Sequence, residues 1–194
     1  MSSAQFPHLQ DLAELVAATL RDSQLPASLL ELEITEGVLL QHTDANLETL
    51  RQLKELGVCI GMDDFGTGHS SLGQIRRLPL DCVKLDRSLM ADLYTDVGAQ
   101  GVTAAVLAMT RTLRIRSVAQ GIEDPESLEI VCCLGCDEVQ GHYISPPLKA
   151  RDFADWLESG GAAVLAQGRA AALAIELEAS KVEVGPTLRT ADLP

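Results

Sequence analysis

Short apolar runs alternate with stretches of helical periodicity from residue 9 to residue 140, and this alternation limits the fold more than any other feature. Strands that alternate with helices of this length form parallel βαβ units with right-handed crossovers. The sequence therefore predicts an α/β fold built on a parallel sheet. The predicted strands cover residues 29–35, 58–62, 81–85, 115–119 and 137–140, and the predicted helices cover 9–20, 46–56, 97–113 and 126–134, with a short helix that ends at Ile75.

Two adjacent aspartates, Asp63 and Asp64, follow the apolar run 58–62 and precede two glycines in the segment DDFGTG (63–68). Adjacent carboxylates at the end of a strand repel each other unless a cation or a basic group lies between them. Carboxylate oxygens are ligands that Mg²⁺ and Mn²⁺ prefer. The pair is therefore predicted to be half of a metal site.

Other polar residues also lie at or near the ends of predicted strands, namely Glu33, Lys84, Gln120 and Gln140. Active sites of (β/α) barrels gather at the carboxyl ends of the strands, so this placement favours a barrel. Five strands are too few to close an eight-stranded barrel. We therefore expect an incomplete TIM-like (β/α) barrel, whose open edges must be covered by another chain or by the tail, or else misassemble.

These motifs resemble those of the EAL-type phosphodiesterases, which hydrolyse the bacterial second messenger cyclic di-GMP. The resemblance covers roughly the first four fifths of the chain. It implies a TIM-like barrel whose N-terminal strands are missing from this sequence. The matching segments are 30–36 (LELEITE), 63–68 (DDFGTG), 78–88 (LPLDCVKLDRS), 135–137 (GCD), 140–141 (QG) and 146–148 (PPL).

The resemblance also implies roles for individual residues. Glu33 and Asp63 would bind one Mg²⁺ or Mn²⁺ ion, and Asp63 and Asp64 would face a second about 4 Å away. Lys84 would orient or deprotonate the attacking water. Gln140 would hold water and Glu123 would support the residues that bind the metal. The expected product is the linear dinucleotide.

Two departures from the family pattern favour a chain that is inactive by itself. The opening Glu-Ala-Leu strand and a metal-binding asparagine are not found in the sequence, and Gln120 stands where the family has a glutamate. Gln120 can still coordinate weakly through its amide oxygen but supplies no charge. Changes around metal ligands typically cost about 10- to 100-fold in affinity or activity. His69 is a conceivable substitute ligand, although a simple loop histidine is the plainer interpretation.

Net charge and cysteine content bear on DNA binding, on the cellular compartment and on zinc binding. The net charge of −13 disfavours DNA binding, which needs clustered basic residues. Five cysteines without an N-terminal secretory signal favour a reducing compartment, and we expect a cytoplasmic protein. The Cys133–Cys136 pair has neither a second cysteine pair nor suitably spaced histidines, so buried thiols are favoured over a zinc site.

The composition changes after Trp156, which places a boundary between a truncated EAL-like domain at 1–158 and a tail at 159–194. The Ala-rich stretch 162–179 is predicted to be a helix that docks on a neighbour or stays exposed, and the end of the chain is predicted to be disordered. Polar residues interrupt this stretch, so a membrane span is not expected.

Three hypotheses remain open at this stage. The chain is a non-catalytic remnant that binds cyclic di-GMP or a protein partner, an active phosphodiesterase whose site is completed in trans or by an upstream segment, or a truncation product without a function of its own. A homodimer is also expected, because the loop 65–72 and the following helix resemble the family's dimer-forming region.

Overall fold

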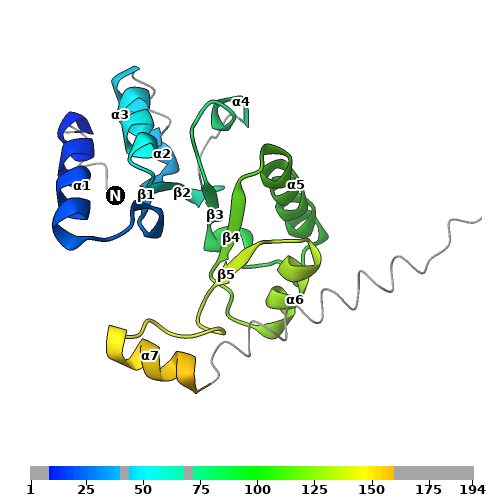
Figure 1. Cartoon of the computed structure of the whole chain (residues 1–194). Coiled ribbons are helices and arrows are strands. Elements are labelled where there is room, and N and C mark those ends of the chain that lie inside the picture. The colour runs from blue at the N-terminus through cyan, green and yellow to red at the C-terminus, as the bar shows by residue number, and fades with distance from the viewer. Residues whose placement is uncertain (1–8, 40–43, 68–71, 160–194) are drawn as a thin grey trace, which may run out of the picture.

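The computed structural model describes residues 9–39, 44–67 and 72–159, and five parallel strands form its centre (Figure 1). The strands lie in the sheet in the order of the sequence, β1-β2-β3-β4-β5. This order and the parallel pairing confirm the predicted α/β fold. The strands are β1 (Glu31–Thr35), β2 (Cys59–Phe65), β3 (Cys82–Leu85), β4 (Arg116–Gln120) and β5 (Glu138–Gln140).

Helices and 3-10 turns connect successive strands. All the predicted helices within the described ranges form, with ends shifted by up to three residues. Two described helices were not predicted, α2 directly after β1 and α7 after β5. The elements are α1 (Leu9–Ser23), η2 (Ala27–Leu29), α2 (Glu36–Leu39), α3 (Asp44–Glu55), α4 (Leu72–Ile75), η3 (Arg87–Leu89), α5 (Val97–Leu113), α6 (Pro125–Cys133) and α7 (Ala150–Glu158).

The starts of α5 and α6 follow from local side-chain chemistry. Asp96 accepts a hydrogen bond from the Gly98 N–H at the start of α5, and Asp124 accepts one from the Ser127 N–H at the start of α6. A carboxylate at this position satisfies a backbone donor that has no partner inside the helix. Pro125 fits the first turn of α6 because its missing N–H is not needed there.

The apolar core lies between the outer face of the sheet and the helices. Alternate strand residues such as Ile34, Ile60 and Val83 are fully buried there. Leu53 of α3 and Leu107 of α5 are also fully buried and belong to the same core. Because strand side chains alternate between faces, the intervening residues point to the opposite, inner face. That inner face carries the polar side chains described below.

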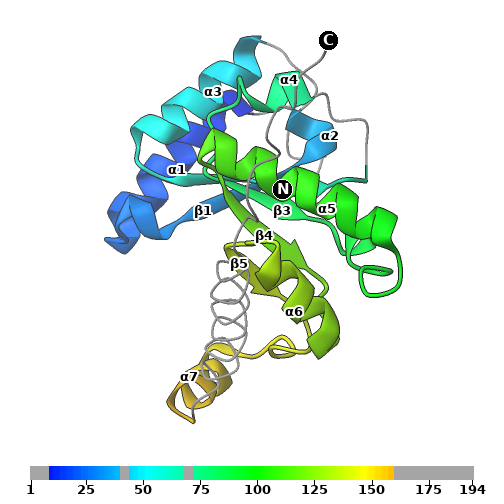
Figure 2. The ribbon, with the colours of Figure 1, turned by 90° about the vertical axis from the view of Figure 1, so that its right-hand side faces the viewer.

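The sheet curves in the manner of a barrel wall but does not close within the described residues. β1 and β5 are its edges, each with a single strand neighbour in the described part of the chain. In both views α7 stands apart from the other helices, beyond the loop that follows β5 (Figures 1 and 2). An incomplete barrel is the architecture that the sequence predicts.

No helix in the described ranges is long and apolar enough to span a membrane. The predicted Ala-rich helix at 162–179 lies outside the described residues, as does the predicted tail 159–194 apart from Ser159.

Candidate functional site

Strand register brings the predicted site residues onto one inner face. Glu33 is the register partner of Gly61, which in turn pairs with Cys82. Gln120 pairs with Gln140. Register partners in a parallel sheet point to the same face, so polar side chains from successive strands converge.

Lys84 on β3 forms an ion pair with Glu33 on β1, across the intervening strand β2. Gly61 of β2 lies beside the glutamates of β1, and a Cβ atom there would lie 3.2 Å from Glu31 Oε1 and 3.7 Å from Glu33 Cγ. The missing side chain at Gly61 therefore leaves room for the side chains of Glu31 and Glu33. The Lys84 side chain is only 11% exposed, so its charge depends on Glu33 for compensation.

Gln120 at the end of β4 donates a hydrogen bond from its side-chain Nε2 to Asp63 Oδ1 of β2, at 3.1 Å. This contact crosses β3 and lies nearer the carboxyl end of the sheet than the Lys84–Glu33 pair. A glutamate at position 120 would instead face the Asp63 carboxylate and repel it unless a cation lay between them. The amide therefore satisfies Asp63 without a metal ion.

Asp64 lies where strand β2 becomes irregular. The β2–β3 register shifts between Met62 and Phe65, and Asp64 has a φ of +58°. This left-handed conformation is uncommon for residues other than glycine, although aspartate tolerates it better than most. Burial, followed by the negative charges of Asp63 and Asp86, raises the pKa of the Asp64 carboxyl. Three carboxylates therefore influence one another at this end of the sheet.

Asp86, directly after β3, was not among the predicted site residues. Its carboxylate accepts a hydrogen bond from the Ser88 N–H at 2.9 Å. Burial alone would raise its pKa, but the hydrogen bonds from Ser88 and Arg87 and the charge of Arg87 outweigh it and lower the pKa of Asp86. Asp86 therefore stays ionised beside Asp64.

Glu36 is a second residue that the sequence did not single out. It is 2% exposed, and its Oε2 accepts a hydrogen bond from the Gly66 N–H at 3.3 Å. Its Oε1 has no hydrogen-bond partner among the described residues. Glu36 thus ties the start of α2 to the loop after β2. Its position three residues after Glu33 was visible in the sequence, but its burial was not.

Arg116 joins three strands at the opposite end of the inner face. Its guanidinium bonds Glu31 Oε2 at 2.6 Å and also contacts Glu138. β1 and β4 are not sheet neighbours, so Arg116 can reach Glu31 only because the sheet is curved. Burial, followed by the Glu31 charge, raises the pKa of the nearby Cys82 thiol to about 12. Cys82 is therefore an inert thiol and not a nucleophile.

Gln140 and Glu123 are both exposed. Gln140 ends β5 beside Gln120, and its carbonyl accepts a hydrogen bond from the Ile122 N–H at 3.1 Å. Glu123 lies in the loop after β4. Their predicted roles in holding water and supporting metal ligands stay predictions. His69, the alternative ligand, lies outside the described residues.

The predicted metal ligands form separate pairs and do not form one cluster. Within residues 9–39, 44–67 and 72–159, no three His, Cys, Asp or Glu side chains gather closely enough to hold a metal ion. Glu33 is held by Lys84, and Asp63 accepts the Gln120 amide. As arranged here, the set does not fit a two-ion site, and the assignment of Glu33, Asp63, Asp64 and Gln120 as ligands stays a prediction.

Comparison with known proteins identifies the family. The model of the EAL domain matches residues 1–147, which is most of the chain. This chain belongs to the EAL domain family. The EAL relatives include the cyclic di-GMP phosphodiesterase NbdA of Pseudomonas aeruginosa, 38% identical over 148 residues, which are 76% of this chain and 19% of that protein.

Solved EAL structures share the fold. The complex of the MucR phosphodiesterase of P. aeruginosa with c-di-GMP matches with a TM-score of 0.74 and 37% identity, covering 79% of this chain and 62% of that one. A manganese and cyclic di-GMP complex of BlrP1 from Klebsiella pneumoniae matches with a TM-score of 0.65 and 28% identity, covering 69% of this chain and 34% of that one. The chain spans about a fifth of the length of the curated relatives it matches.

Proposed function

We propose that this EAL chain is a component of cyclic di-GMP signalling that does not hydrolyse the dinucleotide by itself, and that binds it or a protein partner. Membership of a family with cyclic di-GMP phosphodiesterases supports the signalling role. The hydrogen bond from Gln120 to Asp63 is the observation that most favours the loss of hydrolysis, because an amide takes the place of a charge beside a predicted metal ligand.

Electrostatics make nucleotide binding depend on a cation. The inner face carries Asp63, Asp64 and Asp86, and the one lysine placed among the predicted site residues is paired with Glu33. A dianionic nucleotide is repelled by this field unless a divalent cation offsets it. Mg²⁺ or Mn²⁺ would supply that positive charge if Asp63 and Asp64 rearranged to hold it, since the described residues do not form a ready site.

The compartment is part of the same proposal. Each of the five cysteines is described and free, and burial raises the pKa of the Cys132 and Cys136 thiols. Free thiols suit a reducing compartment. We place the chain in the cytoplasm, where a cyclic dinucleotide messenger would reach it.

Hydrolysis and binding are tested separately. Purified chain is incubated with cyclic di-GMP and Mn²⁺ or Mg²⁺, beside an Asp63→Ala control, and the products are separated by chromatography. We expect no linear dinucleotide. Calorimetry with Mn²⁺ present should then show cyclic di-GMP binding that Asp63→Ala weakens. Turnover that disappears in the control would contradict the proposal, as would the absence of both nucleotide binding and any captured protein partner.

An active phosphodiesterase with a completed site is the second candidate. The match spans only 62% of the MucR chain. The rest of such a chain could supply the groups that complete the site, and this favours the second candidate. Sequencing upstream of the coding region tests it directly. An in-frame Glu-Ala-Leu segment there, together with turnover by the extended protein, would favour this alternative over the first.

A further inference from the structure

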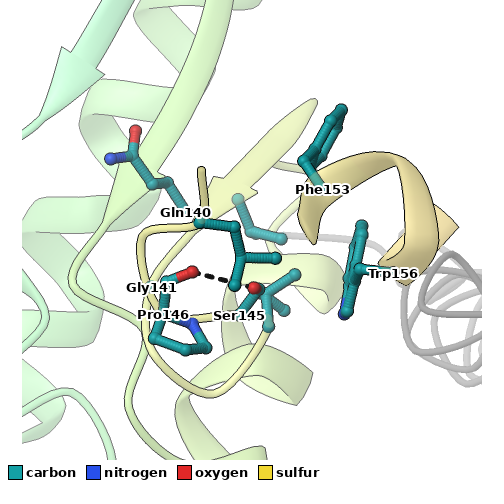
Figure 3. Close-up of a pocket in the computed structure, with 9 residues that line it drawn as sticks. Gln140, Gly141, Ser145, Pro146, Phe153 and Trp156 are labelled. Carbon is teal, nitrogen blue, oxygen red and sulfur yellow. Dashed lines mark hydrogen bonds between the residues drawn. The ribbon is translucent and has the colours of Figure 1, made fainter. Parts of the chain in front are cut away.

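An uncharged groove lies between the edge strand β5 and helix α7 (Figure 3). Its volume is about 230 Å³. Phe153 and Trp156 of α7 line one side, with ring centroids 5.9 Å apart and ring planes at 20°, and the loop after β5 lines the other. Every residue that lines the groove is uncharged, although the chain carries a net charge of −13. The groove is therefore suited to an apolar occupant.

Helix α7 exposes an apolar face beside this groove. Phe153 is 48% exposed and Leu157 46%, and Leu148, just before the helix, is 38% exposed. No residue of α7 is buried in the described part of the chain. Aromatic and aliphatic side chains gain free energy when another apolar surface covers them. This face of α7 is therefore a contact surface.

The segment that follows α7 has apolar residues at helical spacing. It is the Ala-rich stretch 162–179. Its first, fifth, ninth, twelfth and sixteenth residues are all alanine or leucine, and they would share one side of a helix. They are Ala162, Ala166, Ala170, Leu173 and Leu177. Small side chains in such a stripe let two helices approach closely.

The short connection sets the direction in which this segment would pack. Only Ser159, Gly160 and Gly161 separate α7 from it, and helices joined by a loop of about two to five residues form an antiparallel hairpin. Glycine is common directly after the last cap residue of a helix, here Ser159, so Gly160 favours an abrupt end. Helix α7 has nine residues, so Leu173, the twelfth residue of the segment, would reach past the start of α7 toward Leu148.

We propose that residues 162–179 form a helix that packs antiparallel on α7 and closes the groove. Its alanines would cover Phe153 and Trp156, and Leu173 would lie against Leu148 and the loop after β5. A short linker gives the segment a high effective concentration at this surface, which favours it over a separate molecule. The groove would then be filled from within the chain. The proposal rests neither on nucleotide binding nor on the lack of hydrolysis.

Trp156 is the only tryptophan in the chain, so its fluorescence reports directly on the groove. Quenching by acrylamide is compared in the full 194-residue chain and in Leu173→Asp, which places a charge in the apolar stripe. We expect quenching to rise severalfold in the variant and the emission to move to longer wavelength. Ala172→Asp is the matched control, because it adds the same charge on another side of the predicted helix, and it should behave as the parent chain does.

Two results would overturn the proposal. Equal quenching in the parent chain and in Leu173→Asp would show that the segment does not cover Trp156. Protection of Trp156 that grows with the concentration of the parent chain would identify a second copy as the occupant. Urea unfolding checks that the variants keep the fold, and Leu177→Ala, a milder change in the same stripe, replaces Leu173→Asp if that variant does not fold.

Discussion

Lys84 and Gln120 each hold one carboxylate that the family pattern assigns to metal binding. Lys84 forms an ion pair with Glu33, and Gln120 donates to Asp63 at 3.1 Å. A divalent cation would have to displace a lysine from one carboxylate and an amide from the other. Single residues therefore decide whether this inner face is a metal site or a set of internal polar contacts.

Gln120→Glu should increase the affinity for Mn²⁺ about tenfold or more, because a second carboxylate beside Asp63 is stable only when a cation lies between them. Without metal the same variant should be less stable than the parent chain. Calorimetric titration with Mn²⁺ and urea unfolding measure the two effects. Gln52→Glu adds the same charge on the exposed side of α3 and should leave both quantities unchanged.

Lys84→Met should lower the free energy of unfolding by about 1 kcal/mol, because it removes the lysine that pairs with the partly buried Glu33 carboxylate. Glu33 is 40% exposed, so water compensates for part of the loss. Urea unfolding at pH 7 measures it. Adding Glu33→Gln should restore part of the stability, and Arg51→Met, which removes an exposed pair with Glu48, should cost little. No recovery in the double variant would contradict a direct pair.

Asp64→Asn should stabilise the chain at neutral pH. The raised pKa of Asp64 means that the folded state holds a proton on it more tightly than the unfolded state, so ionised Asp64 costs stability at pH 7. This cost disappears as the pH falls and Asp64 is protonated in both states, below about 3.9. The stability gain of the variant should therefore shrink with falling pH. A gain that grows in acid would reverse the sign of the argument.

At the scale of elements, local chemistry fixes the boundaries that the sequence predicted well. The helix predicted at 97–113 has the observed bounds, because Asp96 begins it and the left-handed Arg114 follows its end. The strand predicted from Leu29 begins at Glu31, since a 3-10 turn follows Pro26. Helix α7 was missed although Phe153, Trp156 and Leu157 recur at helical spacing, a signal that the change of composition after Trp156 obscured.

Gly141 allows the loop after β5 to lie against the loop after β4. A Cβ atom at Gly141 would overlap the backbone carbonyl of Ile122, which cannot move as a flexible side chain could. Gly141→Ala should therefore cost about 2 kcal/mol or more in thermal or urea unfolding. Gly101→Ala is the control, since its Cβ meets nothing within 4 Å and helix α5 should gain about 0.5–1 kcal/mol. Similar effects at both sites would contradict the close approach.

At the scale of the molecule, curvature brings strands that are not neighbours into contact. Arg116 of β4 reaches Glu31 of β1, although two strands lie between them. The wall of a barrel is therefore formed even though β1 and β5 do not pair within the described residues. A segment that completed the sheet would therefore join an inner face whose polar contacts between strands are already formed.

Completion of the sheet and a negative charge at position 120 should both be needed for full activity. A chimera that places the N-terminal part of the MucR EAL domain ahead of this chain should hydrolyse cyclic di-GMP at least about 10-fold more slowly than the same chimera carrying Gln120→Glu. Chromatography of the products formed with Mn²⁺ measures the two rates. Asp63→Ala, added to the chimera that carries Gln120→Glu, is the control and should abolish turnover. Equal rates in the two chimeras would show that the amide does not impair the site.

The sequence by itself determined the five strands, their parallel order and the family, because apolar periodicity and the motifs around Glu33, Asp63 and Lys84 are local properties of the chain. Only the tertiary structure decided which polar groups meet. The contacts of Lys84 with Glu33 and of Gln120 with Asp63 each cross an intervening strand, and the burial of Glu36 depends on a loop thirty residues away. Such contacts depend on sheet curvature, which no local pattern encodes.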